Sequence, residues 1–118
     1  MTFDEYSIAA LRTATRAIGE EVSEREDLMI FALGLCGEAG EVADLIKKEM
    51  SHDHKRDTSK LVKELGDVLW YLTVISDRLS ASLDCVAAQN IAKLKARYPG
   101  GFNHADSSRR ADETKGEQ

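Results

Sequence analysis

The sequence predicts an all-α protein. Apolar residues recur at three- and four-residue spacing through most of the chain, which is the period of a helix face. Pro99 is the only proline, so no helix is interrupted before it. Period-two alternation and clusters of aromatic or β-branched residues are scarce, so strands are not indicated. At 118 residues, the chain is long enough for one domain with one modest core.

Helix boundaries follow from capping and stop signals. Thr2 and Glu5 have the spacing of a capping box, which starts the first helix. Asp57 or Thr58 is expected to cap a later helix after a polar loop. The run from Tyr98 to Gly101 is a strong stop signal. We expect four helices, at about residues 2–19, 25–50, 58–80 and 83–98.

The domain organisation is simple. Residues 1–102 are expected to form one helical domain. Residues 103–118 contain almost nothing apolar, so burial cannot offset the entropy of ordering them, and we expect a disordered polar tail.

Three glycines lie inside the second expected helix, at Gly34, Gly37 and Gly40. Each costs up to ~1 kcal/mol relative to alanine in a helix interior. Their presence indicates that another helix or a ligand comes close to the backbone there.

Charge and hydropathy exclude several classes of partner. The net charge of −5 argues against broad binding to nucleic acid or to an anionic membrane. The longest apolar run is far short of a membrane span, and the N-terminus has no basic-then-apolar signal segment. We therefore expect a cytoplasmic protein in which Cys36 and Cys85, which fall within apolar helical patterns, are reduced core thiols.

The first acidic pair, Glu38 and Glu41, lies at the centre of the second expected helix. A three-residue spacing places both carboxylates on nearly the same side. Neither glutamate has a lysine or arginine three or four residues away. Unpaired negative charges beside apolar side chains are costly unless a cation neutralises them. This pattern favours a divalent metal ion.

A second acidic pair, Glu64 and Asp67, repeats this spacing on the third expected helix. Lys60 and Lys63 each precede one of these acids by four residues, so two ordinary surface ion pairs are an alternative. An antiparallel return of the chain would instead bring four carboxylates to one site. Carboxylate oxygens are the ligands that hard cations such as Mg²⁺ prefer.

These motifs resemble a known family. Glu38-x-x-Glu41, twenty-two residues and then Glu64-x-x-Asp67 are similar to the ExxE…ExxD signature of the all-α nucleoside triphosphate pyrophosphohydrolases, and most of all to MazG-like proteins. The resemblance extends to the blocks at 37–44, 64–71 and 93–99, so it covers about residues 25–102.

The resemblance implies both a fold and a reaction. The fold would be an antiparallel four-helix bundle that is completed by dimerisation, as a homodimer or homotetramer. The reaction would be Mg²⁺- or Mn²⁺-dependent hydrolysis of a (d)NTP to a (d)NMP and pyrophosphate, a house-cleaning of nucleotide pools.

The resemblance also implies roles for individual residues. The metal ligands would be Glu38, Glu41, Glu64 and Asp67, and the nucleotide contacts would be Tyr71, Asn90 and Lys93. Some family members carry an extra glutamate, assigned as the base, where this chain has Gly37. Glu38 or Glu41 would then orient the water.

Two aromatic residues follow the second acidic pair. Tyr71 lies four residues after Asp67, where its ring could hold a nucleobase or a sugar, or could pack in the core with its hydroxyl satisfied. Trp70 points about 100° away from it and belongs to the core or to a subunit interface.

Two alternative functions remain. One is a narrower hydrolase of the same superfamily, of the dUTP/dCTP or phosphoribosyl-ATP type. The other is a non-catalytic helical dimerisation module, in which the acidic pairs bind metal only for stability.

Overall fold

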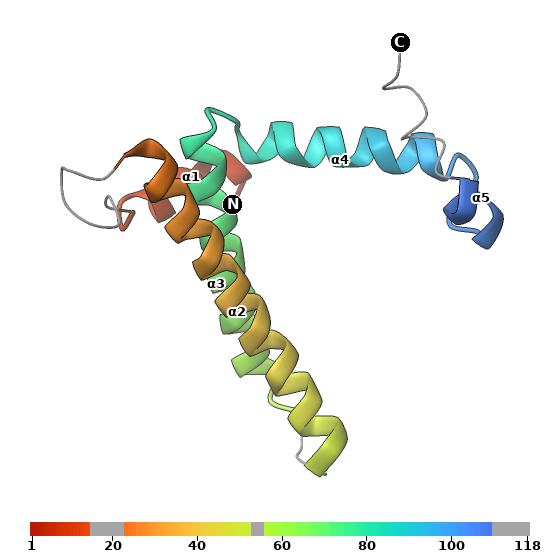
Figure 1. The fold of residues 1–118 in the computed structure, drawn as a ribbon, viewed down its shortest axis with the longest axis horizontal. Helices are drawn as coiled ribbons and strands as arrows, with labels where there is room; N and C mark the ends of the chain where they lie inside the picture. Colours follow the sequence, from red (N-terminus) through yellow and green to blue (C-terminus); the bar gives the residue numbers. More distant parts are fainter. Residues whose placement is uncertain (15–22, 53–55, 110–118) are drawn as a thin grey trace. The chain divides into compact units, whose positions relative to one another are not determined.

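The structure is a computed structural model that describes residues 1–14, 23–52 and 56–109. The described residues form α-helices and no strands, so the predicted all-α class is confirmed. None of the helices in these ranges is both long enough and apolar enough to cross a membrane. The helices are α1 (Phe3–Leu11), α2 (Glu24–His52), α3 (Thr58–Arg78), α4 (Leu83–Arg97) and α5 (His104–Arg109) (Figure 1).

The chain divides into two compact units, Met1–Ser82 and Leu83–Gln118. The first unit holds α1, α2 and α3, and the second holds α4 and α5. Three of the four acids predicted as metal ligands come together in the first unit.

Capping boxes begin both of the first two helices. The predicted box at α1 is confirmed, because Thr2 Oγ1 accepts from the Glu5 N–H at 3.2 Å and Glu5 Oε2 accepts from the Thr2 N–H at 2.7 Å. A second capping box, which was not predicted, begins α2. There, Ser23 Oγ accepts from the Glu26 N–H, and Glu26 Oε2 accepts from both Ser23 donors. These hydrogen bonds lower the pKa of Glu26 and start α2 at Glu24.

The expected first helix ends earlier than predicted. It ends at Leu11 rather than near residue 19, and residues 15–22 lie outside the described ranges. The reason is local, because the Thr13 hydroxyl and the Thr13 N–H both bond the Ala10 carbonyl, at 2.7 and 3.0 Å. The Ala14 N–H bonds the Leu11 carbonyl at 3.1 Å. These short-range bonds tighten the chain into a turn.

The later boundaries lie close to the expected ones. Asp57 caps α3, since its Oδ1 accepts from the Lys60 N–H at 2.9 Å. Ser80 has a φ of 54°, a left-handed conformation that separates α3 from α4. In α4, the helix ends at Arg97, just before the predicted stop.

The polar tail begins with a helix that was not predicted. Where disorder was expected from residue 103, His104–Arg109 form α5, and residues 110–118 lie outside the described part. Asn103 starts α5 because its Oδ1 accepts from the Asp106 N–H at 2.8 Å. An ion pair between Asp106 and Arg109 spans the single turn. Local caps and charge pairs therefore order a segment that has almost no apolar surface.

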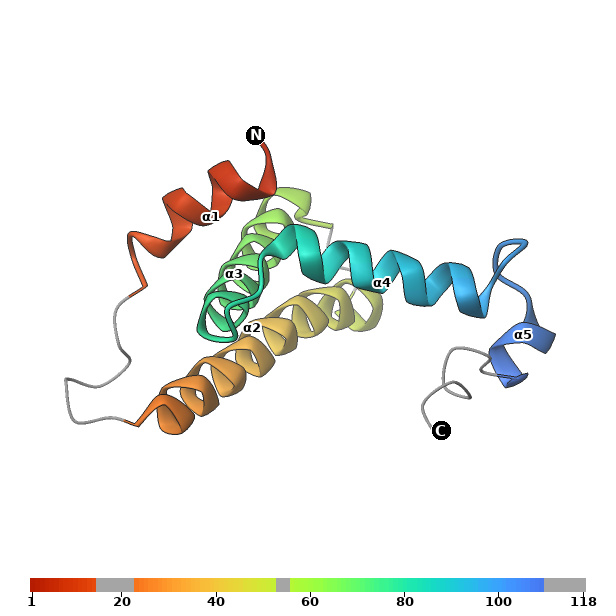
Figure 2. The same cartoon turned by 90° about the horizontal axis from the view of Figure 1, so that it is seen from above.

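Helices α2 and α3 form an antiparallel pair with one register along its whole length (Figures 1 and 2). Asp27 forms an ion pair with Arg78 at one end, and Glu49 forms an ion pair with Arg56 at the other. Between them, Gly34 meets Tyr71. For each residue further along α2, the facing residue lies one position earlier on α3. This constant register is what aligns the acidic segments of the two helices.

Few apolar side chains are buried in the first unit, and an aromatic cluster lies beside them. The prediction that Cys36 and Cys85 lie in the core is wrong, because both are exposed. Val74 is fully buried and Phe31 nearly so. The Phe31 ring lies 5.9 Å from that of Trp70 and 6.2 Å from that of Tyr71, centroid to centroid. Trp70 therefore belongs to the packing within the unit, and its indole N–H bonds α1 through Thr13 Oγ1 at 2.8 Å.

The closest approach between α2 and α3 is at Gly34. A Cβ placed there would lie 2.2 Å from Tyr71 Cε1 and 2.8 Å from its hydroxyl oxygen. Nothing within 4 Å would meet a Cβ at Gly37 or Gly40. Helix packing thus explains the first of the three glycines, and space remains open beside the other two.

Gly34→Ala is expected to destabilise the protein by about 1–2 kcal/mol. The new methyl group would force the Tyr71 ring off Phe31, and overpacking of this kind costs about 1–3 kcal/mol. The gain in helix propensity, at most ~1 kcal/mol, offsets only part of this.

Gly40→Ala is the matched control, because it gains the same propensity and meets no atom within 4 Å. Urea unfolding measures both variants, and we expect opposite signs. Equal stabilisation in the two variants would show that Tyr71 does not need the space at Gly34.

Candidate metal centre

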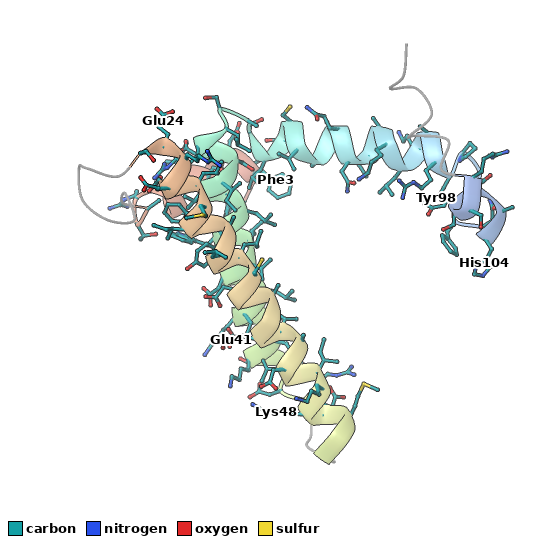
Figure 3. All side chains as sticks on the ribbon, in the orientation of Figure 1. Phe3, Glu24, Glu41, Lys48, Tyr98 and His104 are labelled. Atoms are coloured by element: carbon teal, nitrogen blue, oxygen red, sulfur yellow. The ribbon has the colours of Figure 1, made fainter. Side chains whose placement is uncertain are left out.

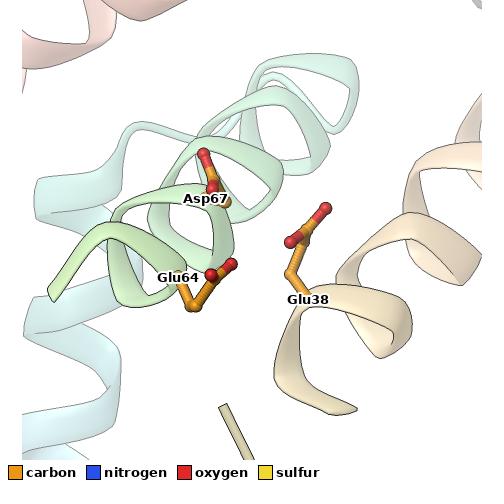
Figure 4. Close-up of side chains that lie close together, drawn as sticks. All are labelled: Glu38, Glu64 and Asp67. Carbon is orange, nitrogen blue, oxygen red and sulfur yellow. The ribbon is translucent and has the colours of Figure 1, made fainter. Parts of the chain in front are cut away.

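Three carboxylates meet where α2 and α3 face each other. Glu38 projects from α2, and Glu64 and Asp67 project from α3, as Figure 4 shows. One oxygen from each lies within 4.8 Å of the other two. The register brings them together, since Glu38 and Asp67 are one helical turn from the Gly34–Tyr71 contact on their respective helices. The structure thus brings together three of the four ligands that the sequence predicts.

The fourth predicted ligand, Glu41, lies outside this cluster of three. It follows Glu38 by one turn of α2, on the way to Lys48 and the connection to α3 (Figure 3). Its charge adds to the raised pKa of Glu38, after desolvation and the charge of Asp67, and to the raised pKa of Lys48, after the hydrogen bond and charge of Asp44. Glu41 therefore belongs to the same electrostatic environment without completing the cluster.

The surface ion pairs that the sequence allowed at α3 do not form within the described residues. Neither Lys60 nor Lys63 lies in ion-pair contact with Glu64 or Asp67. Lys60 instead contributes to lowering the pKa of Asp44, after Lys48 and Lys47. The cluster keeps its negative charge uncompensated by these side chains.

Partial burial and neighbouring charges raise the pKa of Glu38 above its usual value. Desolvation is the larger cause, and the negative charges of Asp67, Glu41 and Glu64 follow in that order. A cation placed among the three oxygens would reverse these repulsions. An all-oxygen set of three carboxylates fits Mg²⁺ or Mn²⁺, which prefer such ligands and keep further positions for water and phosphate.

Glu38→Gln is expected to raise the melting temperature of the metal-free protein at neutral pH. A group with a raised pKa in the folded state stabilises the fold in its protonated form. That stabilisation is complete below the ordinary glutamate pKa of 4.5 and is lost as the pH rises through the pKa of the folded protein. The neutral glutamine avoids this loss.

Melting curves in EDTA and in Mg²⁺, at pH 4 and pH 7, measure this effect. In EDTA, the variant should melt above the wild type at pH 7, and the difference should shrink toward acid pH. Mg²⁺ should raise the melting temperature of the wild type much more than that of the variant. A variant that melts lower than the wild type in EDTA would contradict the repulsion.

The predicted nucleotide contacts lie on two helices. Tyr71 is half-buried on α3, one turn after Asp67, and its ring packs edge-on against Trp70 with centroids 4.9 Å apart. Its contacts match the core packing that the sequence left open. Asn90 and Lys93 lie three residues apart on α4, in the second unit, and both are exposed.

The charge of the cluster acts on one residue that the sequence did not single out. Tyr6 on α1 has its pKa raised by burial and, in smaller part, by the charge of Asp67. In the sequence, Tyr6 is one of several apolar-face residues of the first helix. Helical spacing carries no information about the effect of a charge sixty residues further along the chain.

Fold and site together define an all-α protein with clustered carboxylates on an antiparallel helix pair. The family model of the MazG nucleotide pyrophosphohydrolase domain matches residues 26–102. The chain therefore belongs to the MazG family. It is also 34% identical over 105 residues to the "Gene 37 protein" of Mycobacterium phage L5, an alignment that covers 86% of this chain and 92% of that protein. No solved structure matches the chain.

Proposed function

We propose that this protein hydrolyses nucleoside triphosphates between the α and β phosphates, in a Mg²⁺-dependent reaction that gives a nucleoside monophosphate and pyrophosphate. The observation that carries the proposal is the cluster of Glu38, Glu64 and Asp67, which has no cationic partner among the described side chains and lies inside the region matched by the family. Clearing unwanted nucleotides from the pool is the role that fits this reaction.

The four carboxylates are proposed to have two roles, which are binding of the metal ion and activation of the attacking water. Glu38, Glu64 and Asp67 would hold the ion, which supplies positive charge to the phosphate oxygens and activates water when it is bound. Glu41 completes the ligand set or orients the attacking water. The water oxygen forms a bond to the α-phosphorus, and the bond from that phosphorus to the pyrophosphate oxygen breaks. Glu38 or Glu41 accepts the proton that the water loses.

Other residues would contact the rest of the substrate. Lys93 is proposed to stabilise charge on the departing pyrophosphate, and Asn90 to bond a phosphate or the sugar. Tyr71 is proposed to lie along the nucleoside, with its position fixed by Gly34.

We also propose that the protein is a homodimer or a pair of dimers. Large apolar side chains remain exposed on α2 and α3, and a partner would bury them. They include Leu33 and Met50 on α2, Val62 and Leu65 on α3, and Leu79 at the C-cap of α3. Sedimentation equilibrium measures the mass of the assembly, and a monomer at all concentrations would overturn this part.

The deciding experiment is pyrophosphate release across standard and modified (d)NTPs, with Mg²⁺ and with EDTA. Mg²⁺-dependent release supports the proposal, and the preferred substrate separates a broad enzyme from one of the dUTP/dCTP or phosphoribosyl-ATP type. Mg²⁺-induced stabilisation without release from any substrate would favour the non-catalytic module.

A further inference from the structure

The side of α2 that faces away from α3 carries an apolar surface. Within the first unit, α2 packs against α3, and α1 packs on α3 as well (Figure 2). Between residues 29 and 50, ten exposed residues fall within an arc of about 140° around the helix axis, and nine of them are uncharged. The middle of this arc lies about 150° from Glu38, which points toward α3.

The order of large and small residues along this surface is nearly the same in both directions. Large apolar residues lie near both ends, and small residues occupy the middle. About a point between Ala39 and Gly40, each residue has a counterpart at the same distance along the helix, and one pair differs in size. The four further pairs are Met29 with Met50, Ala32 with Lys47, Leu33 with Ile46, and Cys36 with Ala43. We call these ten residues the outer seam.

The pattern of the outer seam fits an antiparallel copy of α2. A two-fold axis between Ala39 and Gly40 would set small residues against each other at the centre and large residues against each other at both ends. Helices that cross are closest at the crossing point, so small residues suit the centre and large side chains fill the widening space. A Cβ at Gly40 would meet no atom within 4 Å. A second helix in that space accounts for a glycine that packing on α3 does not explain.

Charge favours the antiparallel orientation over the parallel one. In the antiparallel pair Lys47 faces Ala32, so its stem can lie over a small residue while its ammonium group stays in water. In a parallel pair, two Lys47 side chains would face each other, and the acidic first turns with Glu24 and Glu26 would lie side by side. The antiparallel pair also places the start of one helix dipole beside the end of the other.

The area of the outer seam sets the strength of such a contact. An arc of about 140° on a helix about 10 Å across and about 33 Å long has an area of roughly 400 Å². A standard interface buries about 800 Å² per partner. The outer seam alone therefore supports a weak contact between copies, of the kind that joins two dimers which a larger surface already holds.

We propose that copies of this protein associate through the outer seam, with a second α2 lying antiparallel across it about a two-fold axis between Ala39 and Gly40. This contact rests on the homo-oligomer of the proposed function and is one of the surfaces that hold it. Because the outer seam faces away from Glu38, each copy keeps its own metal centre, and the second α2 contributes no residue to it.

Ala39→Cys tests the axis, in a background where Cys36→Ser and Cys85→Ser remove the two exposed thiols. In the proposed pair, the two introduced thiols lie about one residue apart along the helices, at their closest approach. A short bismaleimide should therefore link most of the protein into covalent dimers, as measured on a denaturing gel. Adding Ala43→Glu, one turn further along the outer seam, should lower the yield at least about tenfold, because it buries a charge.

Leu33→Cys in the same background is the matched control on the same helix. In the antiparallel pair its two thiols lie about 20 Å apart, so this variant should not link to itself. It should link to Ile46→Cys when the two proteins are mixed. Linking of Leu33→Cys to itself as efficiently as Ala39→Cys, or no link in Ala39→Cys, would overturn the inference.

The outcomes separate this inference from the proposed function. Pyrophosphate release by the linked Ala39→Cys dimer should equal that of the unlinked protein, and loss of release on linking would show that the outer seam is not separate from the site. If Ala39→Cys does not link while sedimentation shows a dimer, the inference is wrong and the homo-oligomer stands. If the wild type hydrolyses no (d)NTP, the catalytic function fails, and cross-linking still decides the inference.

Discussion

Asp67→Asn is expected to abolish Mg²⁺-dependent release of pyrophosphate while the helices stay intact. The amide keeps the size of the side chain but removes one of three clustered negative charges. A metal ion contributes several kcal/mol of charge stabilisation in the transition state. Losing about 4 kcal/mol of it slows turnover roughly a thousandfold. Turnover is measured by pyrophosphate release, and helix content by circular dichroism.

Asp77→Asn is the matched control for this variant. It makes the same change on the same helix, but Asp77 bonds Arg78 at the far end of α3. We expect its turnover to equal that of the wild type. Unchanged turnover in Asp67→Asn would remove Asp67 from the site, whatever its distance from Glu38.

Glu41→Gln separates the two roles proposed for Glu41. Loss of turnover with full Mg²⁺-induced stabilisation would assign it to the water, which agrees with its place outside the cluster. Loss of both turnover and Mg²⁺-induced stabilisation would make Glu41 a metal ligand. Retention of both would remove it from the site.

The carboxylate cluster could be predicted because its information is local. A three-residue spacing fixes the side of a helix on which each acid lies, and a short polar loop requires an antiparallel return. The absence of cations near Glu38 was also readable in the sequence. At Glu64 and Asp67 the local pattern allowed ion pairs with lysines, and only the packing of the helices decides against them.

Contacts between distant segments could not be predicted in this way. The register of α2 on α3 depends on which side chains fit together, and it follows from the space at Gly34 and the ion pairs at the two ends. The early end of α1 depends on one threonine hydroxyl that bonds the backbone. Neither has a periodic signature, and the same holds for the effect of burial and of the Asp67 charge on the pKa of Tyr6.

Asp27→Asn is expected to destabilise the protein by about 2 kcal/mol. Asp27 is buried, with 4% of its surface exposed, and its Oδ2 accepts from Arg78 Nε at 2.7 Å. This bond raises the pKa of Arg78 and ties the start of α2 to the end of α3. Removing one partner of a fully buried pair costs about 3–5 kcal/mol. The loss is smaller here because Arg78 keeps Asp77 and about a quarter of its side chain is exposed.

The same arginine provides the control, because Asp77 also pairs with Arg78, at 2.9 Å, but is 46% exposed against 6% for the Asp27 side chain. An exposed pair contributes about 0.2–1 kcal/mol, so Asp77→Asn should lie near the wild type in urea unfolding. The guanidinium also lies 5.5 Å from the Phe31 ring centroid, beside the aromatic packing around Tyr71. Asp27→Asn should therefore loosen the Gly34–Tyr71 contact as well. Equal losses in the two variants would mean that burial adds nothing to this pair, and that the register of α2 on α3 is held by the packing of the rings alone.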